Sequence, residues 1–232
     1  DDVTKTFQRH FFDENGTMTV QTQTAHILAL YFHLVPAEFT EQTIQGLIAL
    51  LKKENNHLVT GFLGTAYFCQ TLSDYNCVKE AYDLLLKKDF PSWLYQVEMG
   101  ATTVWEHWDG IKPDGSMWSP DMNSFNHYAY GAVGEWLYRV VAGIDVDASA
   151  PGFRHSVIYP RISDRLESVK ASYETIYGLI RAAWSIRGDD IKLSVTIPHN
   201  TTASIRLDKA KAVSVDAGLY FTSKDGYFEA EA

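Results

Sequence analysis

Residues Asn123–Ile144 read NSFNHYAYGAVGEWLYRVVAGI, and the apolar side chains in this stretch recur at intervals of three and four residues. That spacing predicts an amphipathic helix with Asn123 or Ser124 as its N-cap. Gly143 stands where a glycine commonly ends a helix, at the C′ position. The repeating residues are Phe125, Tyr128, Ala129, Ala132, Val133, Trp136, Leu137, Val140 and Val141.

The sequence before this stretch also has a helical period. Residues 24–35, 40–53 and 73–88 each place apolar side chains on one stripe, and the second of these segments begins at Thr40. We therefore expect a succession of helix pairs joined by short loops, which can close into a toroid of hairpins. Only about six or seven helices are expected before Ala148, too few to close a large ring, so the helical domain is expected to be incomplete.

After residue 153 the pattern changes from helical to alternating. Residues 179–198 are expected to form two strands joined at 188–190, with further strands in 167–178 and 202–208. Alternating apolar residues of this kind predict an antiparallel β-sandwich. The fold class expected is therefore α + β, with a helical domain over 1–147 and a β domain over 148–232. On the second strand, Ile191, Leu193, Val195 and Ile197 are expected to share one face.

Composition narrows the range of partners. A formal net charge of −9 argues against nucleic acid and against anionic membranes, and no apolar run approaches the length of a spanning helix. Cys69 and Cys77 form no CxxC or Cys/His cluster, which argues against a structural zinc. The chain also has no GxSxG, P-loop, GxGxxG or HExxH motif. These absences favour a neutral or polar ligand and a mechanism that depends on carboxylates, without a metal or cofactor.

Tryptophans are concentrated in one region. Five of the six lie between Trp93 and Trp136. Two of them, Trp108 and Trp118, flank the turn-rich segment DGIKPDGSM, so we expect both rings to be exposed on a loop. Exposed tryptophans beside acids suit a sugar site, because the rings stack on the C–H face of a pyranose and the carboxylates bind its hydroxyls.

Glu106 lies in the middle of this aromatic region, and two interpretations of it remain open. Thr103-Val-Trp-Glu106 matches a capping box, in which Glu106 would bond back to the Thr103 amide. Alternatively, Trp105 and Trp108 partly desolvate the carboxylate and suit it to acid/base catalysis. His127 is similarly ambiguous: most histidines are merely accommodated, but this one is expected to lie off the apolar stripe of the predicted helix.

Two motifs, GATTVWEHWDG at residues 100–110 and MNSFNHYAYGAVGEWLYRVVAGI at 122–144, closely resemble the C-terminal part of bacterial-type α-L-rhamnosidases, a family of glycoside hydrolases. QTQTAHILALYFHLVP, TGFLGT, PSWLY and PGFRHSVIYP also resemble that family, so the similarity covers nearly the whole chain. The resemblance implies the C-terminal half of an (α/α)6 barrel followed by a β-sandwich. It also implies inverting hydrolysis of terminal α-L-rhamnosides.

The resemblance further implies roles for individual residues. Glu106 would be the general base and His127 would contact the rhamnose, while Trp105, Trp108 and Asn126 would line the site. Where many relatives have arginine after the glutamate, this chain has His107 and departs from the family pattern.

The family's general acid belongs to the first half of the barrel, which nothing in this sequence matches. The chain is therefore expected to be the C-terminal portion of a longer enzyme, inert alone, whose partner is the N-terminal half and whose substrates are rhamnose-containing glycosides or polysaccharides. If it were active alone, Asp109, Asp114 and Asp121 would be the first candidates for the acid. The alternatives are a non-catalytic carbohydrate-binding or scaffold protein and another α/α-toroid glycosidase.

Overall fold

The computed structural model describes residues 2–208, 214, 220–224 and 227–231. The chain packs into two compact units, Asp1–Val133 and Gly134–Ala232. The boundary expected from the sequence, at 147/148, lies inside the second of these units.

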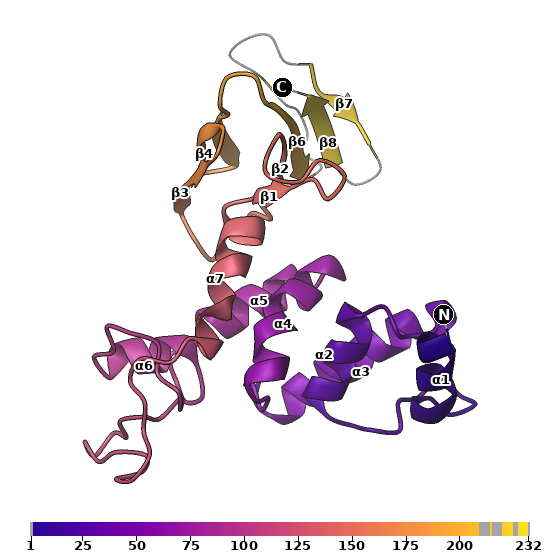
Figure 1. Ribbon diagram of the computed structural model, residues 1–232, viewed down its shortest axis with the longest axis vertical. Coiled ribbons are helices and arrows are strands. Elements are labelled where there is room, and N and C mark those ends of the chain that lie inside the picture. The colour runs from indigo at the N-terminus through magenta and orange to yellow at the C-terminus, as the bar shows by residue number, and fades with distance from the viewer. Residues whose placement is uncertain (1, 209–213, 215–219, 225–226, 232) are drawn as a thin grey trace. The chain divides into compact units, whose positions relative to one another are not determined.

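The first unit is helical, as predicted. Helices α2 and α3, α2 and α4, and α4 and α5 pack against one another as successive neighbours (Figure 1). None of the helices in the described part of the chain has the length and apolar character that a membrane span requires. The helices are α1 (Asp2–Phe11), α2 (Gln23–Tyr31), η1 (Ala37–Phe39), α3 (Thr40–Lys53), α4 (Phe62–Asp74), α5 (Val78–Leu85) and α6 (Trp93–Glu98).

Helix α3 shows how the apolar period determines the packing. It begins at Thr40, as predicted, and buries Ile44, Leu47, Ile48 and Leu51 on one side. Its last turn carries Lys52 and Lys53, whose positive charges favour the carbonyl end of a helix. Each of these buried side chains contributes roughly 1.5–3 kcal/mol relative to full exposure, so the stripe is sufficient to hold α3 against α2.

The helix predicted from Asn123 or Ser124 begins later than the apolar spacing indicated. Residues 101–128 contain no helix, and the regular structure begins with a 3-10 turn, η2 (Ala129–Ala132). It continues as α7 (Val133–Trp136) and ends in a π-helical segment, η3 (Leu137–Val141). Gly143 follows with a φ of 77°, which confirms the predicted C′ glycine.

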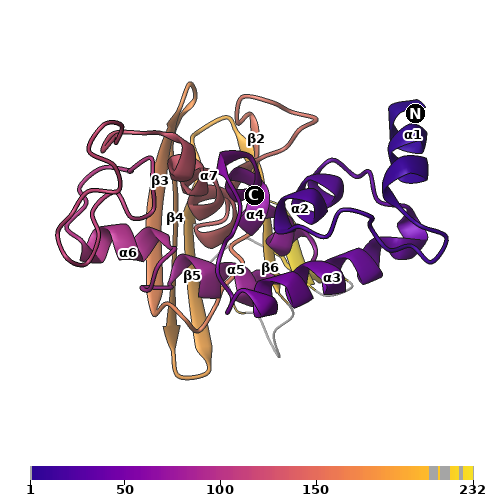
Figure 2. The ribbon, with the colours of Figure 1, turned by 90° about the horizontal axis from the view of Figure 1, so that it is seen from below.

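In the described ranges, the second unit contains two sheets, which follow the end of α7 and η3. One has the order β1-β2-β6-β8-β7 and the other β3-β4-β5, whose strands run side by side in Figure 2. All pairings are antiparallel except β2 with β6, which is parallel. The strands are β1 (Ile144–Val146), β2 (His155–Ile158), β3 (Ser168–Thr175), β4 (Gly178–Arg187), β5 (Asp190–Thr196), β6 (Thr202–Asp208), β7 (Thr222–Ser223) and β8 (Tyr227–Glu231).

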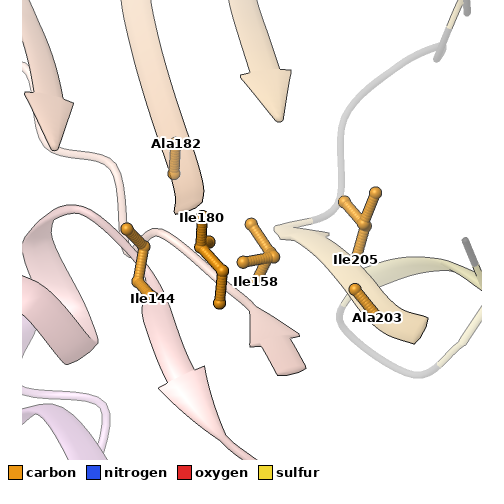
Figure 3. Packing of buried hydrophobic residues seen from close by; sticks show 6 residues of the cluster. All are labelled: Ile144, Ile158, Ile180, Ala182, Ala203 and Ile205. Carbon is orange, nitrogen blue, oxygen red and sulfur yellow. The ribbon is translucent and has the colours of Figure 1, made fainter. Parts of the chain in front are cut away.

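Both sheets contribute to one core. Figure 3 shows the buried side chains of this cluster, which come from β1, β2 and β6 of one sheet and from β4 of the other. Four residues of the second predicted strand were expected to share one face. Three of them, Leu193, Val195 and Ile197, pack against this cluster, whereas Ile191 is 53% exposed. The cluster consists of Ile144, Ile158, Ile180, Ala182, Ala203 and Ile205. The unit is therefore the predicted sandwich.

Candidate active site

Two hydrogen-bonded segments bring Glu106 and His127 together. The backbone N–H of Glu106 donates to the carbonyl of Ser124 over 2.9 Å. The backbone N–H of His127 donates to the carbonyl of Val104 over 2.8 Å. The two residues that the sequence singled out, one from each central motif, therefore lie on adjacent segments of the helical unit.

The capping interpretation of Glu106 is wrong. No helix begins at Thr103, because residues 101–128 have no helical structure. The Thr103 hydroxyl instead donates to the carbonyl of Phe125, on the neighbouring segment. Glu106 is half-buried. Among the described residues its carboxylate has no side-chain hydrogen bond or ion pair. The Glu106 carboxylate is therefore available to bind a water molecule or a ligand.

Backbone groups of the residues on both sides of Glu106 are held by one side chain. The Oε1 atom of Gln96, on α6, accepts a hydrogen bond from the backbone N–H of Trp105 over 3.3 Å. The Nε2 atom of the same amide donates to the carbonyl of His107 over 3.1 Å. Gln96 is 4% exposed, so these bonds are made away from solvent. Gln96 could not be predicted from the sequence, since a glutamine within a helix has no distinctive pattern.

Trp105 and Trp108 are buried, at 3% and 7% exposure. The expectation that Trp108 is an exposed loop ring is therefore wrong. Its ring stacks on Tyr130 with centroids 3.8 Å apart and meets Trp93 edge-on at 5.4 Å. Trp105 packs edge-on against Phe125. These rings come from segments distant in sequence, and they form an apolar layer around the backbone of residues 105–108.

Trp118, in contrast, is 41% exposed, as expected for a loop tryptophan. Its ring stacks on His107 with centroids 3.5 Å apart and 11° between the planes. Its backbone N–H donates to the carbonyl of Gly110 over 3.1 Å, which closes the turn-rich loop between them. The loop therefore folds back over the residue that follows Glu106.

The His127 side chain has a defined orientation and tautomer. It lies before the first helical residue, Ala129, and so outside the helix that the apolar spacing predicted from Asn123 or Ser124. Its ring stacks on Phe62, the first residue of α4, and on Tyr128. Its Nδ1 atom accepts the backbone N–H of Ala129 over 3.3 Å. In the neutral ring the proton is then on Nε2, which can donate to a hydroxyl.

Tyr130 joins the site, although the sequence did not single it out. Its side chain is buried against Trp108 and Phe62. Burial raises the pKa of Tyr130 above its ordinary value, and the negative charge of Glu106 raises it further. The phenol is therefore within electrostatic reach of the Glu106 carboxylate and stays protonated at neutral pH. Its position three residues after His127, in HYAYG, was the only sequence signal.

Asn126 is exposed, and its backbone N–H donates to the Ser124 hydroxyl over 3.4 Å. Nearby, the Asn123 side chain donates to the carbonyl of Gly110 over 2.8 Å. The Asn126 amide is therefore accessible on the same segment that pairs with Glu106. In the described ranges, no group of three or more His, Cys, Asp or Glu side chains has an arrangement that could hold a metal ion.

Comparison with known proteins accounts for this arrangement of motifs. Residues 1–141 match the model of the bacterial α-L-rhamnosidase 6 hairpin glycosidase domain. Residues 143–219 match that of the bacterial α-L-rhamnosidase C-terminal domain. The fold class expected from the sequence, α + β with part of an (α/α)6 helical toroid followed by a β-sandwich, is thereby confirmed.

Individual relatives agree with these matches. An α-L-rhamnosidase of Streptomyces avermitilis is 38% identical over 226 residues, which cover 97% of this chain and 22% of the relative. The crystal structure of the S. avermitilis α-L-rhamnosidase complexed with L-rhamnose superposes with a TM-score of 0.84 at 35% identity, covering 98% of this chain and 22% of that chain. The native α-L-rhamnosidase of Aspergillus terreus gives 0.86 at 35% identity, covering 98% and 25%. The chain thus spans less than a quarter of the curated relative's length, and it belongs to the bacterial α-L-rhamnosidase family.

Proposed function

We propose that this chain supplies the water-activating side of the active site of an inverting glycoside hydrolase that releases terminal α-L-rhamnose. The observation that carries the proposal is the pair of backbone hydrogen bonds that brings Glu106 beside His127. A relative whose structure contains bound L-rhamnose supports the choice of sugar.

In the proposed mechanism, the Glu106 carboxylate accepts a proton from a water molecule. The water oxygen attacks the anomeric carbon on the face opposite the glycosidic oxygen, whose bond to that carbon breaks. A second carboxyl group donates a proton to the leaving oxygen. The two groups stand about 6.5–9.5 Å apart in enzymes of this type, which leaves room for the water. The first product is β-L-rhamnose, with inverted configuration.

The remaining residues are proposed to hold the sugar. The Nε2–H of His127 donates to a rhamnose hydroxyl, and the exposed Asn126 amide offers a second polar contact. The protonated Tyr130 phenol lies within electrostatic reach of Glu106 and can donate to the carboxylate or to the water. Because Trp105 and Trp108 are buried, we propose that they support the site from behind and offer the sugar no open ring face.

We propose that the second carboxyl group lies outside residues 1–232, in the N-terminal half of the same enzyme. Residues 1–147 would form the C-terminal half of the barrel and residues 148–232 the sandwich. The substrates proposed are rhamnose-containing glycosides and polysaccharides.

The test uses the complete natural protein and an aryl α-L-rhamnoside, with the anomeric protons of the product followed by NMR. Appearance of β-L-rhamnose before mutarotation supports an inverting rhamnosidase, whereas α-L-rhamnose as first product excludes the inverting mechanism. A panel of other aryl glycosides is assayed in parallel. Turnover of a different sugar alone would favour another toroid glycosidase, and rhamnose binding without turnover would favour a binding protein. Residues 1–232 alone are expected to be inert, because the proposed acid is missing from them.

A further inference from the structure

We infer that Gln96 is a positioning residue for the proposed base, Glu106. The inference rests on the proposed function and adds a residue that acts through the backbone. Gln96 is 4% exposed, and its amide bonds backbone groups of the residues immediately before and after Glu106, the N–H of Trp105 and the carbonyl of His107.

The two bonds fix the orientation of the Gln96 amide. Oε1 must face the Trp105 N–H, and Nε2 must face the His107 carbonyl. A flipped amide would place oxygen against oxygen and N–H against N–H, leaving all four groups unsatisfied in a buried place. Since a buried polar group without a partner is costly, the observed orientation is strongly preferred.

The base needs such support because its segment has little regular structure. Residues 104–107 belong to no helix or β-strand. The backbone N–H of Glu106 donates one hydrogen bond, to the carbonyl of Ser124. The helix that carries Gln96 is capped by the buried Ser92 side chain, which accepts the N–H of Tyr95 over 3.1 Å. It is anchored to another segment by the indole N–H of Trp93, which donates to the carbonyl of Tyr130 over 2.9 Å. Gln96 thus connects Glu106 to a fixed helix on both sides. A general base has to be held within a fraction of an ångström to direct a water molecule.

The same unit contains a matched control. Gln23, on α2, is 2% exposed, donates to the carbonyl of His57 over 2.9 Å and accepts the N–H of Val59 over 3.0 Å. It therefore bonds one carbonyl and one N–H of the residues on either side of Leu58, as Gln96 does around Glu106, although here the carbonyl comes first in the chain. Loss of either amide removes one hydrogen bond from a backbone N–H and one to a backbone carbonyl. Of the two glutamines, only Gln96 lies beside the proposed base.

The experiment compares Gln96→Met and Gln23→Met in the complete natural protein, with wild type and Glu106→Gln assayed alongside. Methionine keeps the length of the side chain and removes both hydrogen bonds. We expect similar losses of melting temperature in the two methionine variants. We expect kcat on an aryl α-L-rhamnoside to fall roughly 10- to 100-fold in Gln96→Met only, with KM within about twofold of wild type, as for a displaced catalytic group.

Equal kcat losses in the two methionine variants, or a raised KM with unchanged kcat in Gln96→Met, would overturn the inference. If either methionine variant fails to fold, Gln96→Glu and Gln23→Glu are compared instead. Glutamate keeps the bond accepted from the backbone N–H and loses the bond donated to the carbonyl, and the same selective kcat loss is expected. If wild type does not hydrolyse rhamnosides, or Glu106→Gln is fully active, the proposed function fails and the inference fails with it.

Discussion

His127 donates its backbone N–H to the carbonyl of Val104 over 2.8 Å, two residues before Glu106. This bond connects two motifs that are about twenty residues apart in the chain and have no regular secondary structure between them. Any shift of one motif therefore moves the other. The proposed base and the proposed sugar contact are consequently parts of one structural element.

Glu106→Gln is expected to reduce turnover of an aryl α-L-rhamnoside roughly 10²- to 10⁴-fold, the range for loss of a general base. Folding should be retained, because the hydrogen bond from Glu106 to Ser124 uses the backbone. The measurement is kcat together with a thermal melt. Glu98→Gln, which changes an exposed glutamate paired with Lys88, serves as the control and should leave kcat unchanged. Full activity of Glu106→Gln would assign the base to another residue.

His127→Ala is expected to lower kcat/KM roughly tenfold, the equivalent of about one lost hydrogen bond to the sugar. The melting temperature should change little, since Nδ1 bonds only the N–H of Ala129 at the start of η2. Steady-state kinetics and melts on the same protein separate the two effects. His10→Ala, at an exposed position of α1, is the control. A large loss of stability with normal kcat/KM would identify His127 as a packing residue.

The regular elements could be predicted where local pattern and tertiary packing agree. The stripe of α3 and the turn between β4 and β5 are of this kind, because apolar period and turn residues are local signals. The site was less predictable. Phe125 and Tyr128 fit the helical spacing, yet residues 123–128 bond the Glu106 segment instead of continuing the helix. Trp108 has loop-forming neighbours, yet Trp93 and Tyr130 cover it. In both cases partners distant in sequence outweigh the local pattern.

The stability of the helical unit is expected to depend on pH through His26. This side chain is 2% exposed, and its Nδ1 donates to the carbonyl of Thr22 over 2.9 Å. Its Nε2 faces α3, where a Cβ on Gly46 would lie 3.1 Å away. Burial lowers the pKa of His26 from its ordinary value of 6.5, with the Thr22 bond opposing the shift.

The lowered pKa means that the folded protein binds fewer protons at His26 than the unfolded chain does. The stabilisation from His26 is therefore present above about pH 6.5 and is lost as the pH falls through the folded-state pKa. Denaturation midpoints measured from about pH 8 to about pH 5 should fall more steeply in wild type than in His26→Gln. His10→Gln is the control, since it removes an exposed histidine and should keep the wild-type slope. Parallel slopes for wild type and His26→Gln would contradict the prediction.

Gly143→Ala is expected to destabilise the second unit by roughly 2–5 kcal/mol, the sum of left-handed backbone strain and overpacking. Gly143 has a φ of 77°, and a Cβ there would lie 2.1 Å from the backbone nitrogen of Pro160. Gly188 provides the matched control: its φ is 61°, but a Cβ would meet nothing within 4 Å. Gly188→Ala should therefore cost only the strain, about 1–2 kcal/mol. Chemical denaturation of both variants isolates the steric part as their difference. Equal losses would mean that the segment carrying Pro160 moves aside at no cost, and that close packing after η3 does not fix the start of β1.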